Sequence, residues 1–155
     1  MVNFLIWFFL LPTFLFLGGC SRIVKLIEEE FVLECDSSKN PNNWNNCIGN
    51  EKFQSGAEYE GRFVKGEWDG KGTMTYSNGD VYEGQWKENE KDGQGKYTWE
   101  DGAVYEGEWA KNDRNGEGTM NYSNGNKYEG EWVNDKRNGQ GSLTWENGDV
   151  YEGEW

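Results

Sequence analysis

The stretch YEGQWKENEKDGQGKYTWEDGAV, residues 82–104, decides the fold because closely similar stretches precede and follow it. Its opening tripeptide, Tyr-Glu-Gly, recurs every 23 residues, at Tyr59, Tyr82, Tyr105, Tyr128 and Tyr151. This spacing divides the chain into four full units, 59–81, 82–104, 105–127 and 128–150, and a partial unit, 151–155. Gly49, Phe53 and Gly56 match the second half of a unit, so residues 47–58 are interpreted as a degenerate half repeat. A fixed period of this length indicates an array in which each unit packs on its neighbours.

Each unit carries two pairs of turn-forming residues. The first pairs are Asp69-Gly70, Asp92-Gly93, Asn115-Gly116 and Asn138-Gly139, and the second are Asn78-Gly79, Asp101-Gly102, Asn124-Gly125 and Asn147-Gly148. Asn-Gly and Asp-Gly favour hairpin turns because both residues tolerate positive φ. Two turns per unit predict two strands per unit. The fold class is therefore all-β, an elongated single-layer antiparallel meander over residues 59–155, and frequent Gly with no 3.6-residue apolar period argues against helices.

Side chains alternate between the two faces of a strand, which assigns the faces of each unit. Tyr82, Gly84 and Trp86 point one way, and Glu83 and Gln85 point the other. The predicted aromatic face includes Tyr82, Trp86, Trp99, Tyr105, Trp109, Tyr128, Trp132 and Trp145. Glycines on this face leave room for rings to lie across the backbone. The rings are interpreted as the core of a one-layer repeat, and the alternative is a groove that stacks on sugar rings or an apolar peptide.

The opposite face carries an acidic column. Its members are Glu60, Glu83, Glu106, Glu129 and Glu152, reinforced by Glu108, Glu131 and Glu154. Equivalent strands lie about 10 Å apart, at roughly 4.8 Å per strand, so neighbouring members cannot share one divalent cation. The column is interpreted as a solvated face, and no metal site or cofactor is predicted.

Composition excludes several classes of function. The formal net charge is −13, which argues against binding nucleic acid or anionic lipid headgroups. The chain has no His, which serine-type triads, His-paired cysteine nucleophiles and most catalytic zinc sites require. We therefore predict that the protein is not an enzyme, and no small-molecule substrate is evident.

The N-terminal segment predicts a signal for export. Residues 2–17 are almost wholly apolar and run into Leu17-Gly18-Gly19-Cys20 before the chain becomes polar. Residues 1–19 are interpreted as a signal peptide and residues 20–46 as a tether and spacer. An uncleaved anchor of about 18 residues is the alternative. Both interpretations place residues 21–155 outside the inner membrane.

The three cysteines divide between two expected roles. If Cys20 carries lipid, Cys35 and Cys47 remain in an oxidising compartment, separated by a polar, loop-like segment. We predict a disulfide between them, with two free thiols as the alternative. A zinc site lacks ligands, because two Cys and no His cannot fill a tetrahedral shell.

Two resemblances extend these predictions. The pattern Tyr-Glu-Gly-x-Trp, then Gly-x-Gly, then a later Gly before the next Tyr resembles the MORN repeat over residues 59–155 and more loosely over 47–58. The resemblance implies a twisted, elongated single sheet that serves interaction, oligomerisation or membrane-proximal scaffolding. Leu17-Gly18-Gly19-Cys20 resembles a bacterial lipobox, which implies cleavage before Cys20, its diacylation and, with Ser21 following, export to an outer membrane.

Together these features predict a lipid-anchored scaffold of the bacterial cell envelope, with its array facing the periplasm or the exterior. The array is expected to bind another protein or a second copy of itself, because the last strand ends at Trp155 with an open edge. The alternative function is a glycan- or peptidoglycan-binding module that uses the aromatic face.

Overall fold

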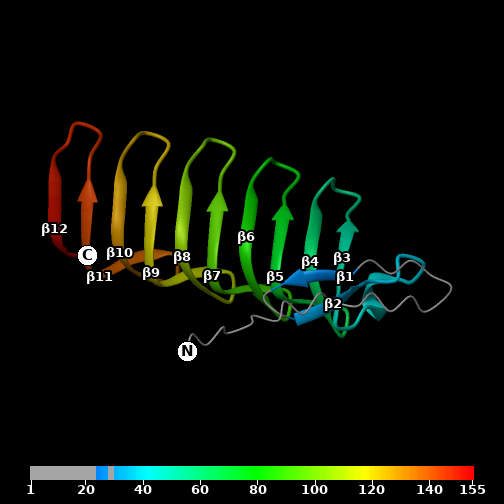
Figure 1. Ribbon diagram of the computed structural model, residues 1–155. Coiled ribbons are helices and arrows are strands. Elements are labelled where there is room, and N and C mark those ends of the chain that lie inside the picture. The colour runs from blue at the N-terminus through cyan, green and yellow to red at the C-terminus, as the bar shows by residue number, and fades with distance from the viewer. Residues whose placement is uncertain (1–23, 28–29) are drawn as a thin grey trace, which may run out of the picture.

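The computed structural model describes residues 24–27 and 30–155, which form one sheet of 12 strands in chain order. The strands are β1 (Val24–Ile27), β2 (Glu30–Glu34), β3 (Cys47–Lys52), β4 (Glu58–Val64), β5 (Glu67–Thr75), β6 (Val81–Lys87), β7 (Glu90–Thr98), β8 (Val104–Ala110), β9 (Asp113–Asn121), β10 (Lys127–Val133), β11 (Lys136–Thr144) and β12 (Val150–Glu154). Figure 1 shows β3 to β12 side by side as an elongated row of hairpins. The predicted all-β antiparallel meander is confirmed from β3 onward.

The N-terminal strands join this row differently. β1 and β2 form an antiparallel pair, and β2 then pairs with β3 in parallel, with Leu33 opposite Cys47. The one helical segment within residues 24–27 and 30–155 is a short 3-10 turn, Pro41–Asn43. No helix in that part of the chain has the length and apolarity to cross a membrane. The predicted signal peptide, residues 1–19, and the lipidation site, Cys20, lie outside the described residues.

The second turn of each unit forms as predicted. In the loop between β5 and β6, the Gly79 amide donates to the Tyr76 carbonyl at 3.0 Å, and the Tyr76 amide donates to the Asp80 carbonyl at 2.9 Å. Gly79 has a φ of +93°, in the left-handed region that glycine enters without a steric penalty. A three-residue loop that ends in such a glycine is a common hairpin connection. Asn78-Gly79 and its equivalents therefore mark true turns.

The first predicted turn is in the wrong place. Lys65 and Gly66, rather than Asp69 and Gly70, form the tight connection between β4 and β5, and both have positive φ, +54° and +81°. The same two-residue turn recurs at Glu88-Asn89, Lys111-Asn112 and Asn134-Asp135. Turns of this mirror-image type match the twist of the flanking strands and need positive φ at both central residues.

The Asp-Gly and Asn-Gly pairs instead form bulges inside the second strand. Gly61 faces Gly72 and Phe63 faces Trp68, so one residue of β4 lies opposite three residues of β5. Gly70, within this bulge, has a φ of +95°. A bulge of this kind bends the strand and increases its local twist.

Residues 35–46 form a folded cap at the N-terminal end of the array. Cys35 and Cys47 form the predicted disulfide, with their Cα atoms 5.0 Å apart. Trp44 is buried and meets Phe63 edge to face at 4.8 Å, and its indole nitrogen donates to the Asp36 carbonyl. The cap closes over the first hairpin because the Trp44 carbonyl also accepts a hydrogen bond from the Gly66 amide at 2.7 Å. The predicted tether and spacer, 20–46, therefore includes a folded segment at its C-terminal end.

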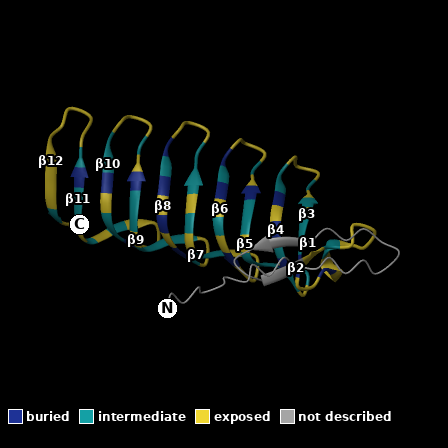
Figure 2. Cartoon of the chain, viewed as in Figure 1, coloured by how far each residue is buried: buried dark blue, intermediate teal, exposed yellow. Residues whose placement is uncertain are grey.

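The core recurs once per unit along the sheet. Figure 2 shows buried segments along the row from β4 to β11, whereas the loops at the ends of the strands are exposed. The buried apolar residues are Trp44, Cys47, Tyr59, Phe63, Met74, Tyr82, Trp86, Ala103, Tyr105, Trp109, Met120, Tyr128, Trp132 and Leu143. Each unit therefore contributes a tyrosine and a second ring from its first strand and an apolar residue near its second loop.

Candidate interaction surfaces

The tyrosines of the aromatic face lie across pairs of glycines. Tyr82 is fully buried, and Gly84 faces Gly95 on the neighbouring strand. A Cβ atom at either glycine would overlap the Tyr82 ring or hydroxyl. The hydroxyl donates to the Gln85 carbonyl at 2.9 Å, so its polar atom is satisfied although the ring is buried. Burial raises the pKa of Tyr82 well above its ordinary value.

The tryptophans of this face join each unit to the unit before it. Trp86 meets Tyr82 of its own unit and Tyr59 of the preceding unit edge to face, with ring centroids 5.0 Å and 5.5 Å apart. Its indole nitrogen donates to the Gly72 carbonyl of the preceding unit at 3.1 Å. Trp109 and Trp132 make the equivalent bonds at 3.1 Å and 3.2 Å. Ring packing and a hydrogen bond therefore act together between successive units.

A row of cations covers these rings, and sequence reasoning missed it. Lys91 Nζ lies 4.3 Å from the centroid of Trp109, and the Arg114 guanidinium lies 4.3 Å from that of Trp132. Arg137 lies 4.5 Å from the Trp155 centroid, and Trp68 occupies the same repeat position in the first unit, stacked on Tyr59 at 4.5 Å. The available signal was a positive residue recurring every 23 positions, two residues after each tight turn.

Lys91 and Arg114 of this row are partly buried and lie beside carboxylates that hold them in position. Burial lowers the pKa of Lys91, and the nearby Asp135 and Asp113 oppose that shift. Arg114 Nε lies 2.8 Å from the Asp135 carboxylate, which also accepts from the Arg114 backbone amide at 3.0 Å. A cation held against a ring in a partly desolvated site contributes roughly 1–2 kcal/mol.

The predicted aromatic face is thus mainly an internal packing surface. The buried members are Tyr82, Trp86, Tyr105, Trp109, Tyr128 and Trp132. Trp99 packs against this core with part of its surface exposed, and Trp145, in the loop after β11, is 39% exposed. The buried rings do not form an open platform on which a sugar ring could stack. This removes the main structural support for the glycan-binding alternative.

Asp80 links two neighbouring loops. It is the one buried acidic residue among the side chains that the structure describes. Its carboxylate accepts from the Tyr97 hydroxyl at 2.8 Å and from the Glu100 amide at 2.9 Å. Burial alone would raise the pKa of Asp80, but these bonds, together with one from Asn78, outweigh it and hold the pKa below its ordinary value. The charged Asp80 carboxylate therefore has a structural role, because it holds its own loop to Tyr97 and Glu100 of the next unit's second strand and loop.

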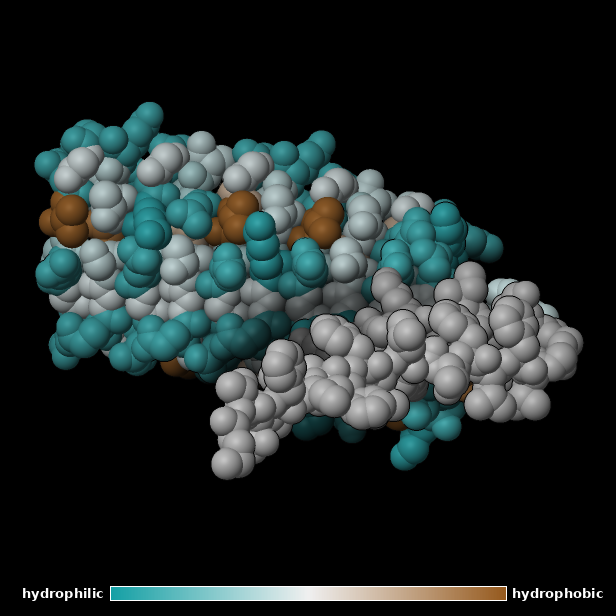
Figure 3. All heavy atoms as spheres, in the orientation of Figure 1, coloured by the Kyte–Doolittle hydropathy of each residue, from teal (hydrophilic) through white to brown (hydrophobic). Residues whose placement is uncertain are grey.

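The polar face contains a groove with a glycine floor. Strand pairing places Gly61, Gly72, Gly84, Gly95 and the later glycines in one continuous line across the strands; that line continues through Gly107, Gly118, Gly130, Gly141 and Gly153. Figure 3 shows this line as a pale band between two hydrophilic rows. The groove has a volume of about 750 Å³ between Ile48 and Glu106 and continues for about 340 Å³ to Gly130.

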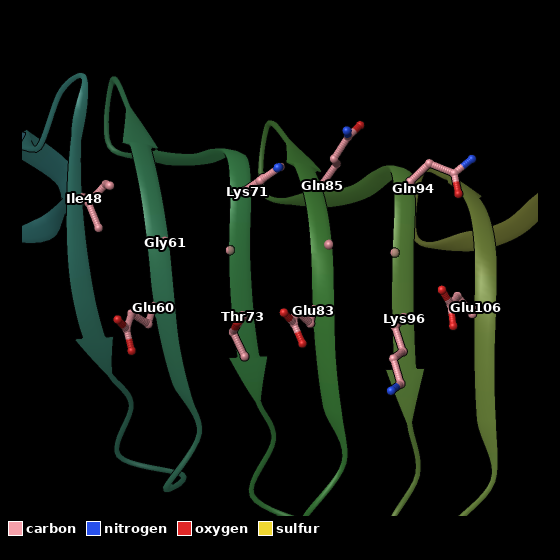
Figure 4. Close-up of a pocket in the computed structure, with 13 residues that line it drawn as sticks. Ile48, Glu60, Gly61, Lys71, Thr73, Glu83, Gln85, Gln94, Lys96 and Glu106 are labelled. Atoms are coloured by element: carbon pink, nitrogen blue, oxygen red, sulfur yellow. The ribbon is translucent and has the colours of Figure 1, made fainter. Parts of the chain in front are cut away.

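The side chains on the two sides of the floor form its walls. Figure 4 shows Glu60, Glu83 and Glu106 on one side, with Thr73 and Lys96 between them, and Lys71, Gln85 and Gln94 on the other. These residues belong to alternate positions of the strands, so they point away from the aromatic core. The acidic column predicted from the sequence is therefore one wall of a groove.

Comparison with known proteins places the repeats in a family. The MORN repeat family model matches residues 59–81, 82–104, 105–127 and 128–150, more than half of the chain. No curated protein matches the sequence. A similar solved structure is the TCP domain of SAS-4 (dCPAP) from Drosophila melanogaster in complex with a proline-rich motif, at 12% identity and a TM-score of 0.23. That match covers 68% of this chain and 82% of the other.

The four matched segments have the same boundaries as the four units defined by Tyr59, Tyr82, Tyr105 and Tyr128. Each unit forms the same hairpin, and the second, third and fourth units each donate an indole hydrogen bond to the unit before them. The chain belongs to the MORN-repeat family.

Proposed function

We propose that this MORN-repeat chain is a non-catalytic, membrane-tethered scaffold of the bacterial cell envelope that binds another protein through its array. MORN repeats are consistent with a repeat-based scaffold for protein interaction or membrane association. The observation that carries the proposal is the difference between the two faces of the sheet. The aromatic face is occupied by internal packing, whereas the polar face presents a groove that runs along the row of strands.

The membrane tether rests on the sequence of the N-terminal segment. The apolar residues 2–17 and the tetrapeptide Leu17-Gly18-Gly19-Cys20 support lipidation of Cys20 and placement on an outer membrane. Two or three acyl chains anchor a protein stably, whereas one holds it only marginally. The Cys35–Cys47 disulfide supports the same location, because such bonds persist in oxidising compartments.

Affinity capture of the full chain from envelope membranes tests the scaffold role. After crosslinking in cells and purification through a C-terminal tag, we expect a stoichiometric protein partner to be recovered with the wild-type chain. The Cys20→Ser variant should retain the precursor length, lose label from a palmitate analogue and lose the partner if that partner is membrane-bound. Recovery of no crosslinked protein with the wild-type chain would contradict the binding part of the proposal. Label on the Cys20→Ser variant equal to that on the wild type would contradict the lipidation part.

A further inference from the structure

The groove changes character along its length. Its walls on β4 to β7 carry three cations, Arg62, Lys71 and Lys96, against two carboxylates, Glu60 and Glu83. From β8 to β12 the same wall positions carry seven carboxylates and no cation; they are Glu106, Glu108, Glu117, Glu129, Glu131, Glu152 and Glu154. Lys127, which forms an ion pair with Glu129 at 2.9 Å, lies outside the two wall positions. The distal part of this face, along which the groove extends to Gly130, is therefore strongly negative.

The carboxylates in this half are arranged as pairs. The first strand of each unit presents Glu-Gly-Glu, with the glycine in the floor and one carboxylate on each wall. These pairs are Glu106 with Glu108 on β8, Glu129 with Glu131 on β10, and Glu152 with Glu154 on β12. Residues two apart on a strand are separated by about 6.6 Å, so a cation above the floor can approach both members of a pair.

The pairs repeat at a spacing that an extended chain can match. Neighbouring strands lie roughly 4.8 Å apart, so pairs on alternate strands lie about 10 Å apart. Three residues of polyproline II advance about 9 Å with their side chains returning to the same face, whereas residues three apart in a β-extended chain point to opposite faces. A polyproline II chain that lies along the floor therefore brings every third residue to a new carboxylate pair.

We infer that the polar face from β8 to β12 binds a segment of a partner protein in the polyproline II conformation that carries Lys or Arg at every third position. The segment lies across the strands over the glycine floor, with one cation between each Glu-Gly-Glu pair. The charge on the groove selects the basic residues, and the spacing between units sets their period. The inference rests on the proposed scaffold function and names the chemistry of its partner.

Three cations of the array that recur with the period of the repeat lie away from this groove. Lys91, Arg114 and Arg137 cover the rings on the opposite face of the sheet. Gly107 and Gly118 face the Tyr105 ring on the aromatic side, so on the polar side only backbone lies between the two walls. The backbone of a ligand can lie on this floor, and its side chains can contact the carboxylates of the two walls.

Fluorescence anisotropy with two labelled 12-residue peptides tests the inference on the purified full chain in detergent. The first peptide has Lys at positions 1, 4, 7 and 10 with Pro and Ala elsewhere, and the second has the same composition with the four Lys contiguous. We expect the spaced peptide to bind at least about fivefold more tightly at low salt. Both affinities should fall as salt is raised, because these charges are exposed.

A matched pair of variants locates the binding. Replacing Glu106, Glu129 and Glu152 by Gln should weaken binding of the spaced peptide by about tenfold, because three modest ion pairs are lost together. Replacing the exposed Glu67, Glu90 and Glu146 by Gln removes the same charge elsewhere and should change the affinity less than twofold. Equal binding of the two peptides, or equal effects of the two variants, would overturn the inference. If neither peptide binds while crosslinking still recovers a partner, the inference fails and the scaffold function stands.

Discussion

At the scale of single residues, the array depends on glycines that admit a ring. Gly107 lies opposite Gly118, and a Cβ at Gly107 would come within 2.5 Å of the Gly118 Cα and 2.7 Å of the Tyr105 hydroxyl. Gly107→Val therefore forces either the backbone or the ring to move, which costs about 1–3 kcal/mol. We expect the melting temperature to fall by several degrees, measured by circular dichroism.

Gly102→Ala is the matched control for this change. Gly102 has positive φ, but a Cβ atom at this position would have no neighbouring atom within 4 Å, so the substitution adds only backbone strain. Its effect should be clearly smaller than that of Gly107→Val. Equal losses would mean that steric exclusion by Tyr105 is not what requires glycine at position 107.

Residue-level alternation predicted the burial of the first-strand rings but not the exposure of Trp145, which it assigned to the same face. Tyr82 and Trp86 lie inside and Glu83 and Gln85 lie outside, because strand periodicity alone assigns them. The cation row could not be predicted in the same way. Lys91 and Arg114 are ordinarily surface residues, and only the arrangement of rings in space shows that their charges are placed over aromatic faces.

At the scale of elements, the N-terminal cap is closed by a covalent bond, the Cys35–Cys47 disulfide. The disulfide closes a loop between residues 12 apart, worth on the order of 3 kcal/mol in the chain-entropy model. Reduction, or Cys35→Ser together with Cys47→Ser, should lower the melting temperature. It should also increase hydrogen exchange in β3 and β4, because Trp44 packs on Phe63 from the closed loop.

Exchange in β10 and β11 serves as the internal control for this prediction, because these strands lie several hairpins away from the cap along the sheet. Protection there should remain close to that of the oxidised protein. A melting temperature unchanged by reduction would show that the cap is held by Trp44 and its hydrogen bonds without the covalent bond.

The tight turns show where prediction at this scale failed. Asp69-Gly70 has the stronger turn-forming sequence, yet the chain turns at Lys65-Gly66. A bulge and a tight turn both require positive φ and therefore both favour Gly, Asn or Asp, so local sequence alone does not distinguish them. The tertiary requirement that decides between them is the pairing of Gly61 with Gly72, which sets the register of the whole hairpin.

At the scale of the whole molecule, the units are interchangeable because each makes the same contacts to its predecessor. Deletion of residues 82–104 would bring Trp109 to the Gly72 carbonyl that Trp86 now uses. We expect the shortened protein to fold with a near-ultraviolet circular dichroism spectrum of the same shape and a modestly lower melting temperature. Repeat arrays gain stability from nearest-neighbour interfaces, so one lost interface is tolerated.

Deletion of residues 82–89 is the control for this experiment, since it removes one strand and one turn. Every later strand would then run in the wrong direction for antiparallel pairing, and the protein should aggregate or remain unfolded. Unfolding of the whole-unit deletion as well would contradict the interchangeability of the units.

The contacts between successive units have a consequence for the order in which the hairpins can form. Trp86 donates to a carbonyl 14 residues earlier, and the Asn89 and Asn112 amides donate to the carbonyls of Trp68 and Lys91, each in the previous unit. A chain that emerges from its N-terminus therefore finds these acceptors already assembled. Successive hairpins can then add to the disulfide-closed cap. Each addition closes only a short loop, and short loops close quickly. Each hairpin thus offers the pairing edge for the next one, and the hairpins can form in chain order.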